Sequence, residues 1–174
     1  MIEPIDDERR AEVIAATNQY LQLAETVYQH PLKEVHIRFD LLGSSAGMFK
    51  VAGNKYIIRY NPWLFAKFYQ ENLTGTVPHE VAHFAVHCHY RRRVKPHGPE
   101  WLALMQAFDA DPSVTCNFDL GGIPQRRQRR YNYHCGCRLH EVSARRHNTM
   151  VRGKGRYQCL HCNGELTRTQ PLFD

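Results

Sequence analysis

The residues best suited to do chemistry form the pentapeptide His79-Glu80-Val81-Ala82-His83, an H-E-x-x-H pattern. On a helix, positions four apart lie on one face, so the two imidazoles can reach a single zinc ion. Glu80 is offset around the helix, where it can take a proton from a zinc-bound water and return it to a leaving amine. The pattern predicts a catalytic zinc site with Glu80 as the catalytic residue. Buried or surface histidines without a metal are the alternative interpretation.

A catalytic zinc site usually has a third protein ligand, and His97 is the best candidate for it. His97 lies 14 residues after His83, which is about 21 Å along an unbroken helix. The chain must therefore turn back, and residues 96–99, which contain two prolines and a glycine, provide a break and a new helix start. We expect Trp101, one turn later, to pack against this histidine. Glu100 is the alternative ligand, because a carboxylate also binds zinc.

These residues must be positioned by helices packed on a small, mostly antiparallel sheet. Apolar side chains recur at helical spacing in four segments, and two more segments alternate as strands of a hairpin around Gly53-Asn54. In the last helix, Trp101, Leu102, Met105 and Phe108 are expected to face the core. The predicted helices are 7–30, 61–68, 79–89 and 99–108, and the predicted strands are 35–39, 48–51 and 56–60.

A second constellation consists of four cysteines, Cys135 and Cys137 followed by Cys159 and Cys162, with 21 residues between the pairs. In a reducing compartment such short spacings indicate a metal site rather than disulfides. Four thiolates can form a closed tetrahedral zinc site that contributes most of a small unit's folding energy. Four thiols without metal is one alternative. In another, a histidine replaces one cysteine (His134, His140 or His147).

Positive charge is concentrated in the same part of the chain. Residues 126–174 hold 11 Lys and Arg against 3 Asp and Glu, whereas residues 1–125 hold 12 against 14. A concentrated positive surface attracts polyanions, although a solubilising tail is the simpler interpretation. The candidate nucleic-acid-binding residues are Arg126, Arg127, Arg129, Arg130, Arg145, Arg146, Arg152, Lys154 and Arg156.

Three tyrosines lie among these basic residues: Tyr131, Tyr133 and Tyr157. They could stack on unpaired bases or form the small core of a metal-stapled unit, and core packing is the simpler interpretation. No segment resembles a helix that reads base edges, so the sequence predicts nucleic-acid binding without sequence specificity.

Composition bounds the remaining possibilities. The chain has 174 residues, is 43% hydrophobic and 23% charged, and carries a formal net charge of +6. No apolar run reaches the length of a membrane-spanning helix, and the first ten residues do not resemble a signal peptide. We therefore expect a monomeric cytoplasmic protein with no membrane partner. A glycine- and arginine-rich connector near residue 122 predicts two domains, 1–122 and 123–174.

Val77-Pro78-His79-Glu80-Val81-Ala82-His83, followed by residues 96–101 (PHGPEW), resembles the SprT family of zinc metalloproteases. The cysteine-rich segment 133–162 resembles the same family, and the similarity covers roughly residues 10–166. The resemblance implies an α+β fold with a zincin-like protease domain followed by a small zinc ribbon. It also implies His79, His83 and His97 as zinc ligands and Glu80 as the catalytic residue. Eukaryotic relatives, the Spartan proteases, cleave proteins crosslinked to DNA and are activated by DNA.

The expected function is a zinc-dependent endopeptidase that acts on DNA-bound or DNA-crosslinked proteins. It would hold one catalytic and one structural Zn²⁺ ion, align protein substrates along an edge strand, and bind single-stranded DNA through its ribbon. One alternative is a non-catalytic nucleic-acid-binding or transcription-related zinc protein, against which the retained Glu80 argues. Another is a metal-dependent hydrolase of a different bond.

Overall fold

A computed structural model of the protein describes residues 2–90, 94–113, 118–125 and 129–169. It divides into two compact units, Met1–Gln125 and Arg126–Asp174. The domain boundary predicted after residue 122 lies three residues before this division. No helix within the described ranges combines the length and apolar character needed to cross a bilayer.

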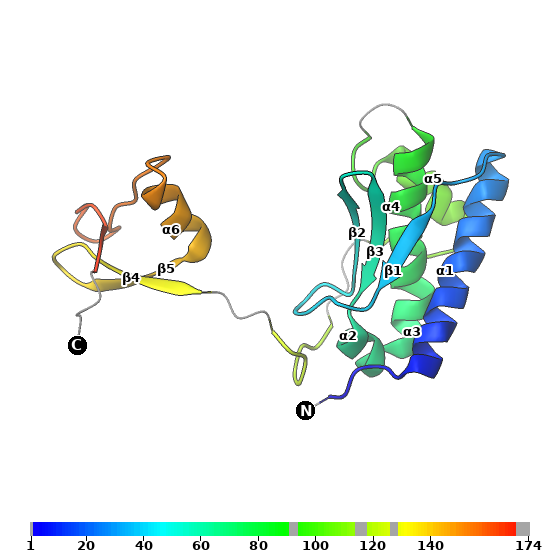
Figure 1. The fold of residues 1–174 in the computed structure, drawn as a ribbon, viewed down its shortest axis with the longest axis horizontal. Helices are drawn as coiled ribbons and strands as arrows, with labels where there is room; N and C mark the ends of the chain where they lie inside the picture. Colours follow the sequence, from blue (N-terminus) through cyan, green and yellow to red (C-terminus); the bar gives the residue numbers. More distant parts are fainter. Residues whose placement is uncertain (1, 91–93, 114–117, 126–128, 170–174) are drawn as a thin grey trace. The chain divides into compact units, whose positions relative to one another are not determined.

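The N-terminal unit begins with the long helix α1 (Asp7–Tyr28), as predicted (Figure 1). The Asp6 side chain caps it by accepting a hydrogen bond from the Arg9 amide at 2.9 Å. The helix ends at Gln29, which has a left-handed φ of 51°. Val13, Thr17 and Ala24 are its buried residues, so only a narrow stripe of this polar helix faces the core.

The sheet of this unit contains β1 (Val35–Arg38), β2 (Gly47–Ala52) and β3 (Lys55–Tyr60) in the order β1-β3-β2. Strands β2 and β3 form the predicted antiparallel hairpin, but β1 pairs parallel to β3. The prediction of a mostly antiparallel sheet is therefore wrong for this unit, whose sheet is mixed. Strands β1 and β2 are consecutive in the chain but lie at opposite edges of the sheet, and β3 pairs with both of them in the centre.

The helices α2 (Pro62–Lys67), α4 (Val77–His89) and α5 (Pro99–Ala107) match three predicted helices within a few residues. Two elements between α2 and α4 were not predicted: α3 (Tyr69–Glu71) and a π-helical turn η1 (Asn72–Thr76). The buried Asn72 supports this region. Its amide group donates to the Leu64 and Phe68 carbonyls, and its side-chain oxygen accepts from Thr76 Oγ1 at 2.7 Å.

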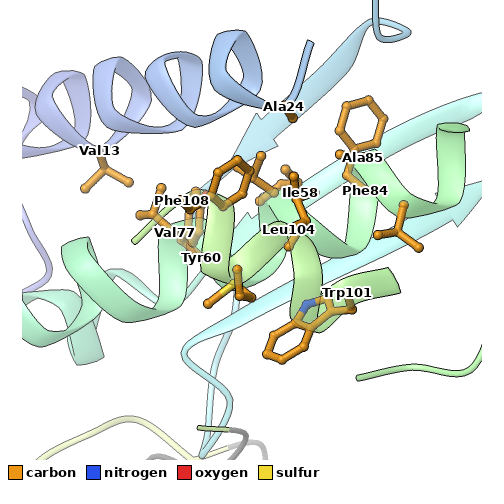
Figure 2. Close-up of a cluster of buried hydrophobic side chains, with 14 of the residues drawn as sticks. Val13, Ala24, Ile58, Tyr60, Val77, Phe84, Ala85, Trp101, Leu104 and Phe108 are labelled. Atoms are coloured by element: carbon orange, nitrogen blue, oxygen red, sulfur yellow. The ribbon is translucent and has the colours of Figure 1, made fainter. Parts of the chain in front are cut away.

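Helix α4 is the central element of the unit, since it contacts α1, α5, β2 and β3. Figure 2 shows large apolar side chains from these elements gathered around it, among them Ile58, Tyr60, Phe84 and Leu104. The predicted inward stripe of α5 needs one correction. Leu104 is buried and Leu102 is 37% exposed, because positions 101, 104, 105 and 108 follow the i, i+3, i+4, i+7 spacing of one helix face.

The C-terminal unit contains β4 (Arg130–His134), β5 (Leu139–Ser143), α6 (Ala144–Val151) and the short β6 (Thr167–Arg168). Its strands pair antiparallel in the order β5-β4-β6. Helix α6 was not predicted. Among residues 129–169 the buried side chains are few: Tyr133, Val142, His147 and Cys159.

Candidate active site and metal centres

Three histidines converge on one point in the N-terminal unit. The Nε2 atom of His83 lies 3.1 Å from that of His79 and 3.0 Å from that of His97, and the His79–His97 separation is 3.1 Å. His79 and His83 come from one face of α4, and His97 comes from the turn that precedes α5. The described residues that form this group do not include the alternative candidate, Glu100.

The spacing of the three nitrogens fits a shared metal ion. Nitrogen ligands of a tetrahedral zinc ion lie about 3.3 Å apart, close to the separations of 3.0–3.1 Å in this site. Neutral imidazoles are the form that binds a metal. Burial, together with the neighbouring imidazoles, lowers the pKa of His79 to about 4 and that of His83 to about 3, and burial lowers the pKa of His97.

Trp101 on α5 packs against all three imidazoles, as predicted for His97. Its ring centre lies 4.8 Å from those of His79 and His97 and 5.7 Å from that of His83. Its indole N–H also donates to the His79 carbonyl at 3.4 Å. His97 has a left-handed φ of 55°, which is unfavourable for a non-glycine residue and is typical of constrained functional positions. The indole and this turn together orient the third histidine.

The Glu80 carboxylate lies on the side of α4 that faces the sheet. Its side chain is buried, with the residue 7% exposed, and its Oε2 accepts a hydrogen bond from the Phe49 amide of β2 at 2.7 Å. Burial raises the pKa of Glu80 from 4.5 to about 7, and the Phe49 hydrogen bond opposes that rise. The Phe49 contact was missed by the sequence analysis because a backbone amide carries no residue-type signal.

A cleft of about 570 Å³ lies beside the histidines. Apolar and aromatic side chains such as Phe49, Tyr56 and Val86 form much of its lining, together with Trp101, His83 and His97, and Lys33 and Lys95 also line it. The rings of Phe49 and Tyr56 also pack against His87, whose ring centre lies 5.5 and 5.7 Å from theirs. The cleft therefore combines an apolar wall with the candidate metal centre.

The four predicted cysteines come together in the C-terminal unit. Cys135, Cys137, Cys159 and Cys162 place their sulfur atoms within 4.8 Å of one another. The Cys135–Cys137 and Cys137–Cys159 separations are 3.2 and 3.8 Å, comparable with the value of about 3.8 Å between thiolates on a tetrahedral zinc ion. The His161 and Gly164 amides donate to Cys159 and Cys162, each at 3.4 Å, as in a metal-binding knuckle.

The three histidines weighed as substitutes for a cysteine have different positions. His140 lies beside the cluster, with Nε2 3.2 Å from the Cys135 sulfur. His147 belongs to the small core, stacked on Tyr131 at 3.6 Å and hydrogen-bonded to the Tyr133 hydroxyl at 2.9 Å. His134 contacts Thr167 on the surface.

The chain has two further cysteines, Cys88 and Cys116, and a further basic run, Arg91-Arg92-Arg93. Cys88 and Cys116, which lack a partner at short spacing, are predicted to be buried thiols. Cys88 is half-buried, and Cys116 lies outside the described residues. The basic run 91–93 also lies outside them.

The candidate nucleic-acid-binding residues that the structure describes are all exposed. Arg126 and Arg127 lie outside the described residues. On α6, the Arg146 guanidinium lies over the Tyr157 ring, 5.4 Å from its centre, beside a cleft of about 550 Å³. Arg156 pairs loosely with Glu165 at 3.6 Å. The exposed residues are Arg129, Arg130, Arg145, Arg146, Arg152, Lys154 and Arg156.

Two of the three tyrosines pack in the core of the C-terminal unit, and the third has a position suited to stacking on a base. Tyr133 is buried and Tyr131 stacks on His147, so both belong to the small core of the C-terminal unit. Tyr157 is half-buried and lines the cleft beside Arg146. Within the described ranges, Tyr157 is the one of the three tyrosines whose ring lies under an exposed arginine, Arg146.

The fold and these sites define an α+β protein with a three-histidine candidate metal centre on one unit and a four-cysteine cluster on the other. The chain belongs to the SprT-like family, whose model matches residues 16–119. That range contains the three histidines and Glu80.

Curated relatives match most of the chain. Protein SprT of Klebsiella pneumoniae (strain 342) is 36% identical over 155 residues, covering 88% of this chain and 89% of the relative. Protein SprT of Pasteurella multocida (strain Pm70) is 36% identical over 149 residues, covering 85% and 87%. Protein SprT of Yersinia pestis is 35% identical over 159 residues, covering 88% of each. No solved structure matches significantly.

Proposed function

We propose that this protein is a zinc-dependent endopeptidase of the zincin type that acts on DNA-bound or DNA-crosslinked proteins. The observation that carries the proposal is the convergence of three histidine Nε2 atoms, two of them from α4, together with a buried glutamate, Glu80, next to His79 in that helix. A purely structural metal site has no need of such a carboxylate. We further propose that the protein acts as a monomer in the cytoplasm.

His79, His83 and His97 would hold the catalytic ion. When bound, zinc supplies Lewis acidity, which lowers the pKa of a water molecule and polarises a carbonyl group. Three protein ligands leave one coordination position open, as catalytic zinc sites require. Trp101 keeps the three imidazoles in place and covers one side of them.

Glu80 would act as the proton carrier of the reaction. A group with a pKa of about 7 exchanges protons readily at neutral pH. Its carboxylate would take a proton from the attacking water and return it to the amine of the cleaved peptide. The Phe49 amide holds one carboxylate oxygen, so the side chain has a defined orientation before a substrate binds.

Strand β2 and the adjoining cleft would bind the protein substrate. In the described sheet β2 pairs only with β3, so it presents a free edge to which an extended peptide can add. The cleft of about 570 Å³ beside the histidines can receive a substrate side chain. Its aromatic wall of Phe49 and Tyr56 favours an apolar side chain there.

The C-terminal unit would be a zinc ribbon that binds nucleic acid. The four cysteines would hold a structural zinc ion, and the exposed arginines would contact phosphates. The Tyr157 ring next to Arg146 could stack on an unpaired base, which favours single-stranded DNA. Such contacts carry no sequence specificity. Binding would raise the local concentration of protein substrates on the same DNA.

The decisive experiment is proteolysis of a DNA-binding protein with and without single-stranded DNA. Wild type should cleave it, and Glu80→Gln should lose about 10²–10⁴-fold in rate while keeping its metal content. Cleavage that requires both DNA and Glu80 would establish a DNA-activated protease. Cleavage that does not depend on DNA would support the protease activity but contradict the proposal that the substrates are linked to DNA. No cleavage by folded, zinc-loaded protein would favour the non-catalytic alternative.

A second experiment tests the ribbon. Charge reversal of Arg145→Glu with Arg146→Glu should weaken DNA binding and flatten its salt dependence by about one to two units of slope. The matched control is Arg38→Glu with Lys55→Glu, which changes net charge equally at exposed sites of the other unit. An unchanged affinity and slope in the ribbon variant would remove these residues from the DNA-binding surface.

A further inference from the structure

We propose that strand β2 positions the Glu80 carboxylate through two residues, the Phe49 amide, which holds it, and Gly47, which leaves room for it. This proposal rests on the proposed role of Glu80 as proton carrier. Gly47 and Phe49 act through Glu80 and are therefore positioning residues.

The first contact is the hydrogen bond from the Phe49 amide to Glu80 Oε2, at 2.7 Å. In an antiparallel pair every second residue directs its N–H away from the partner strand. Phe49 uses such an N–H, since it donates to α4 instead of to β3. The carboxylate is thus bound to the Phe49 amide, on the side of β2 that does not pair with β3.

The second contact is a close approach that only glycine allows. A Cβ atom on Gly47 would lie 2.6 Å from Cγ and 2.8 Å from Oε1 of Glu80, and 2.7 Å from Cγ2 of Thr76. Gly47 does not have a positive φ, so its backbone conformation does not require glycine. The space above Gly47 is instead filled by the Glu80 side chain.

The two contacts enclose the carboxylate from one strand. Gly47 and Phe49 are two residues apart, so they share the same orientation on β2. One faces the Cγ and Oε1 atoms of Glu80, and the other binds its Oε2 atom. Catalytic groups must be held within about 0.5 Å of their working position. The substrate is proposed to align on the same strand. Strand β2 would therefore fix the position of the substrate backbone and of the Glu80 carboxylate relative to each other.

The first test is Gly47→Ala, which should displace the carboxylate without touching the histidines. We expect kcat to fall at least tenfold while KM changes less than twofold and the metal content stays that of wild type. The matched control is Gly75→Ala, because a Cβ there meets nothing within 4 Å and no positive φ is present. A Gly47→Ala enzyme with wild-type kcat would overturn the proposal.

A second test measures melting temperature instead of activity, and compares the same substitution in two backgrounds. Gly47→Ala should lower the melting temperature of the full-length protein by several degrees, because Glu80 and Thr76 cannot both move away. The double variant Glu80→Ala with Thr76→Ser removes the clashing atoms. In that background, Gly47→Ala should lower the melting temperature by at most about a third as much. An equal shift in both backgrounds would show that the space at Gly47 is not held for Glu80, and would overturn the proposal.

A third variant probes the amide alone. Replacing Phe49 by the α-hydroxy acid phenyllactate removes the N–H and keeps the side chain, and should lower kcat with little change in KM. An unchanged kcat would contradict the positioning role. The failures are distinguishable: an inactive wild type overturns the proposed function, whereas an active wild type with unaffected Gly47 and Phe49 variants overturns only this inference.

Discussion

The two units of this protein relate to their candidate metal centres in opposite ways. The N-terminal unit buries large side chains from α1, α4, α5 and the sheet. Its three converging histidines are half-buried and pack against Trp101 of that core. The C-terminal unit buries few side chains, and one of them, Cys159, is itself a member of the cysteine cluster. A unit of that size seldom folds on its apolar contacts alone.

This difference indicates what each ion would do. In the N-terminal unit the fold would exist without metal, and the ion would add chemistry at a prepared site. In the C-terminal unit the ion would replace the missing core, because metal binding and folding are then one equilibrium. The following predictions test that contrast.

The largest effect should come from removing the ribbon metal. Cys159→Ser, or chelation, should unfold the C-terminal unit, because structural zinc contributes about 10–16 kcal/mol to small metal-stapled domains. Amide NMR signals of that unit should collapse to unfolded positions while those of the N-terminal unit persist. His83→Ala is the control, since it should reduce metal content by one ion and leave both units folded. Unfolding of the N-terminal unit on chelation would contradict the contrast.

Truncation of a core side chain should instead destabilise the N-terminal unit. Leu104→Ala should destabilise the N-terminal unit by about 2–5 kcal/mol, because Leu104 is 1% exposed beneath α4. Both tryptophans belong to that unit, so denaturant unfolding followed by tryptophan fluorescence reports on it alone. Leu102→Ala, on the outer face of the same helix, should cost far less. Similar losses in the two variants would show that Leu104 does not belong to the core.

Acidification should weaken the metal-free N-terminal unit. The pKa values of His79 and His83 are lowered from 6.5 to about 4 and 3. Below pH 6.5 the unfolded chain therefore binds protons that the folded chain does not, and stability falls as the pH drops toward 4.

Protonation of Glu80 has the opposite effect on the stability of the metal-free N-terminal unit. Its pKa is raised from 4.5 to about 7, so the folded state holds the extra proton and gains stability as the pH falls from 7 to 4.5. Glu80→Gln should thus make the loss of stability steeper. Melting temperatures of metal-free protein between pH 7.5 and 4.5 test both signs, and a shallower slope in the variant would contradict them.

The smallest effect should come from one hydrogen bond in the ribbon. Tyr133→Phe removes the hydroxyl that lies 2.9 Å from His147 Nδ1, and should cost about 0.5–1.5 kcal/mol. Tyr131→Phe, which keeps the ring stacked on His147, is the control. If the metal dominates the stability of this unit, Tyr133→Phe should leave it folded, as judged by NMR at neutral pH. Its unfolding would assign more of that stability to the small core.

Several elements could be predicted because their signals are local. The turn at Gly53-Asn54, the helix that begins at 61–62 and the helix that begins at Pro99 depend on nearest neighbours in the chain. The parallel pairing of β1, the π-helical turn η1 and helix α6 were missed. Strand order depends on long-range packing, and η1 is stabilised by Asn72 through contacts with the preceding helix.

The sequence by itself determined which residues could bind metals, because imidazoles four residues apart on a helix and closely paired thiols must lie near one another. It also suggested His97, through the prolines and glycine that turn the chain back. Only the tertiary structure brought His97 to within 3.1 Å of both other histidines and set Glu80 against Phe49 and Gly47 of β2. Those contacts join residues 14 to 33 positions apart, and their geometry depends on how α4 packs against α5 and against the sheet.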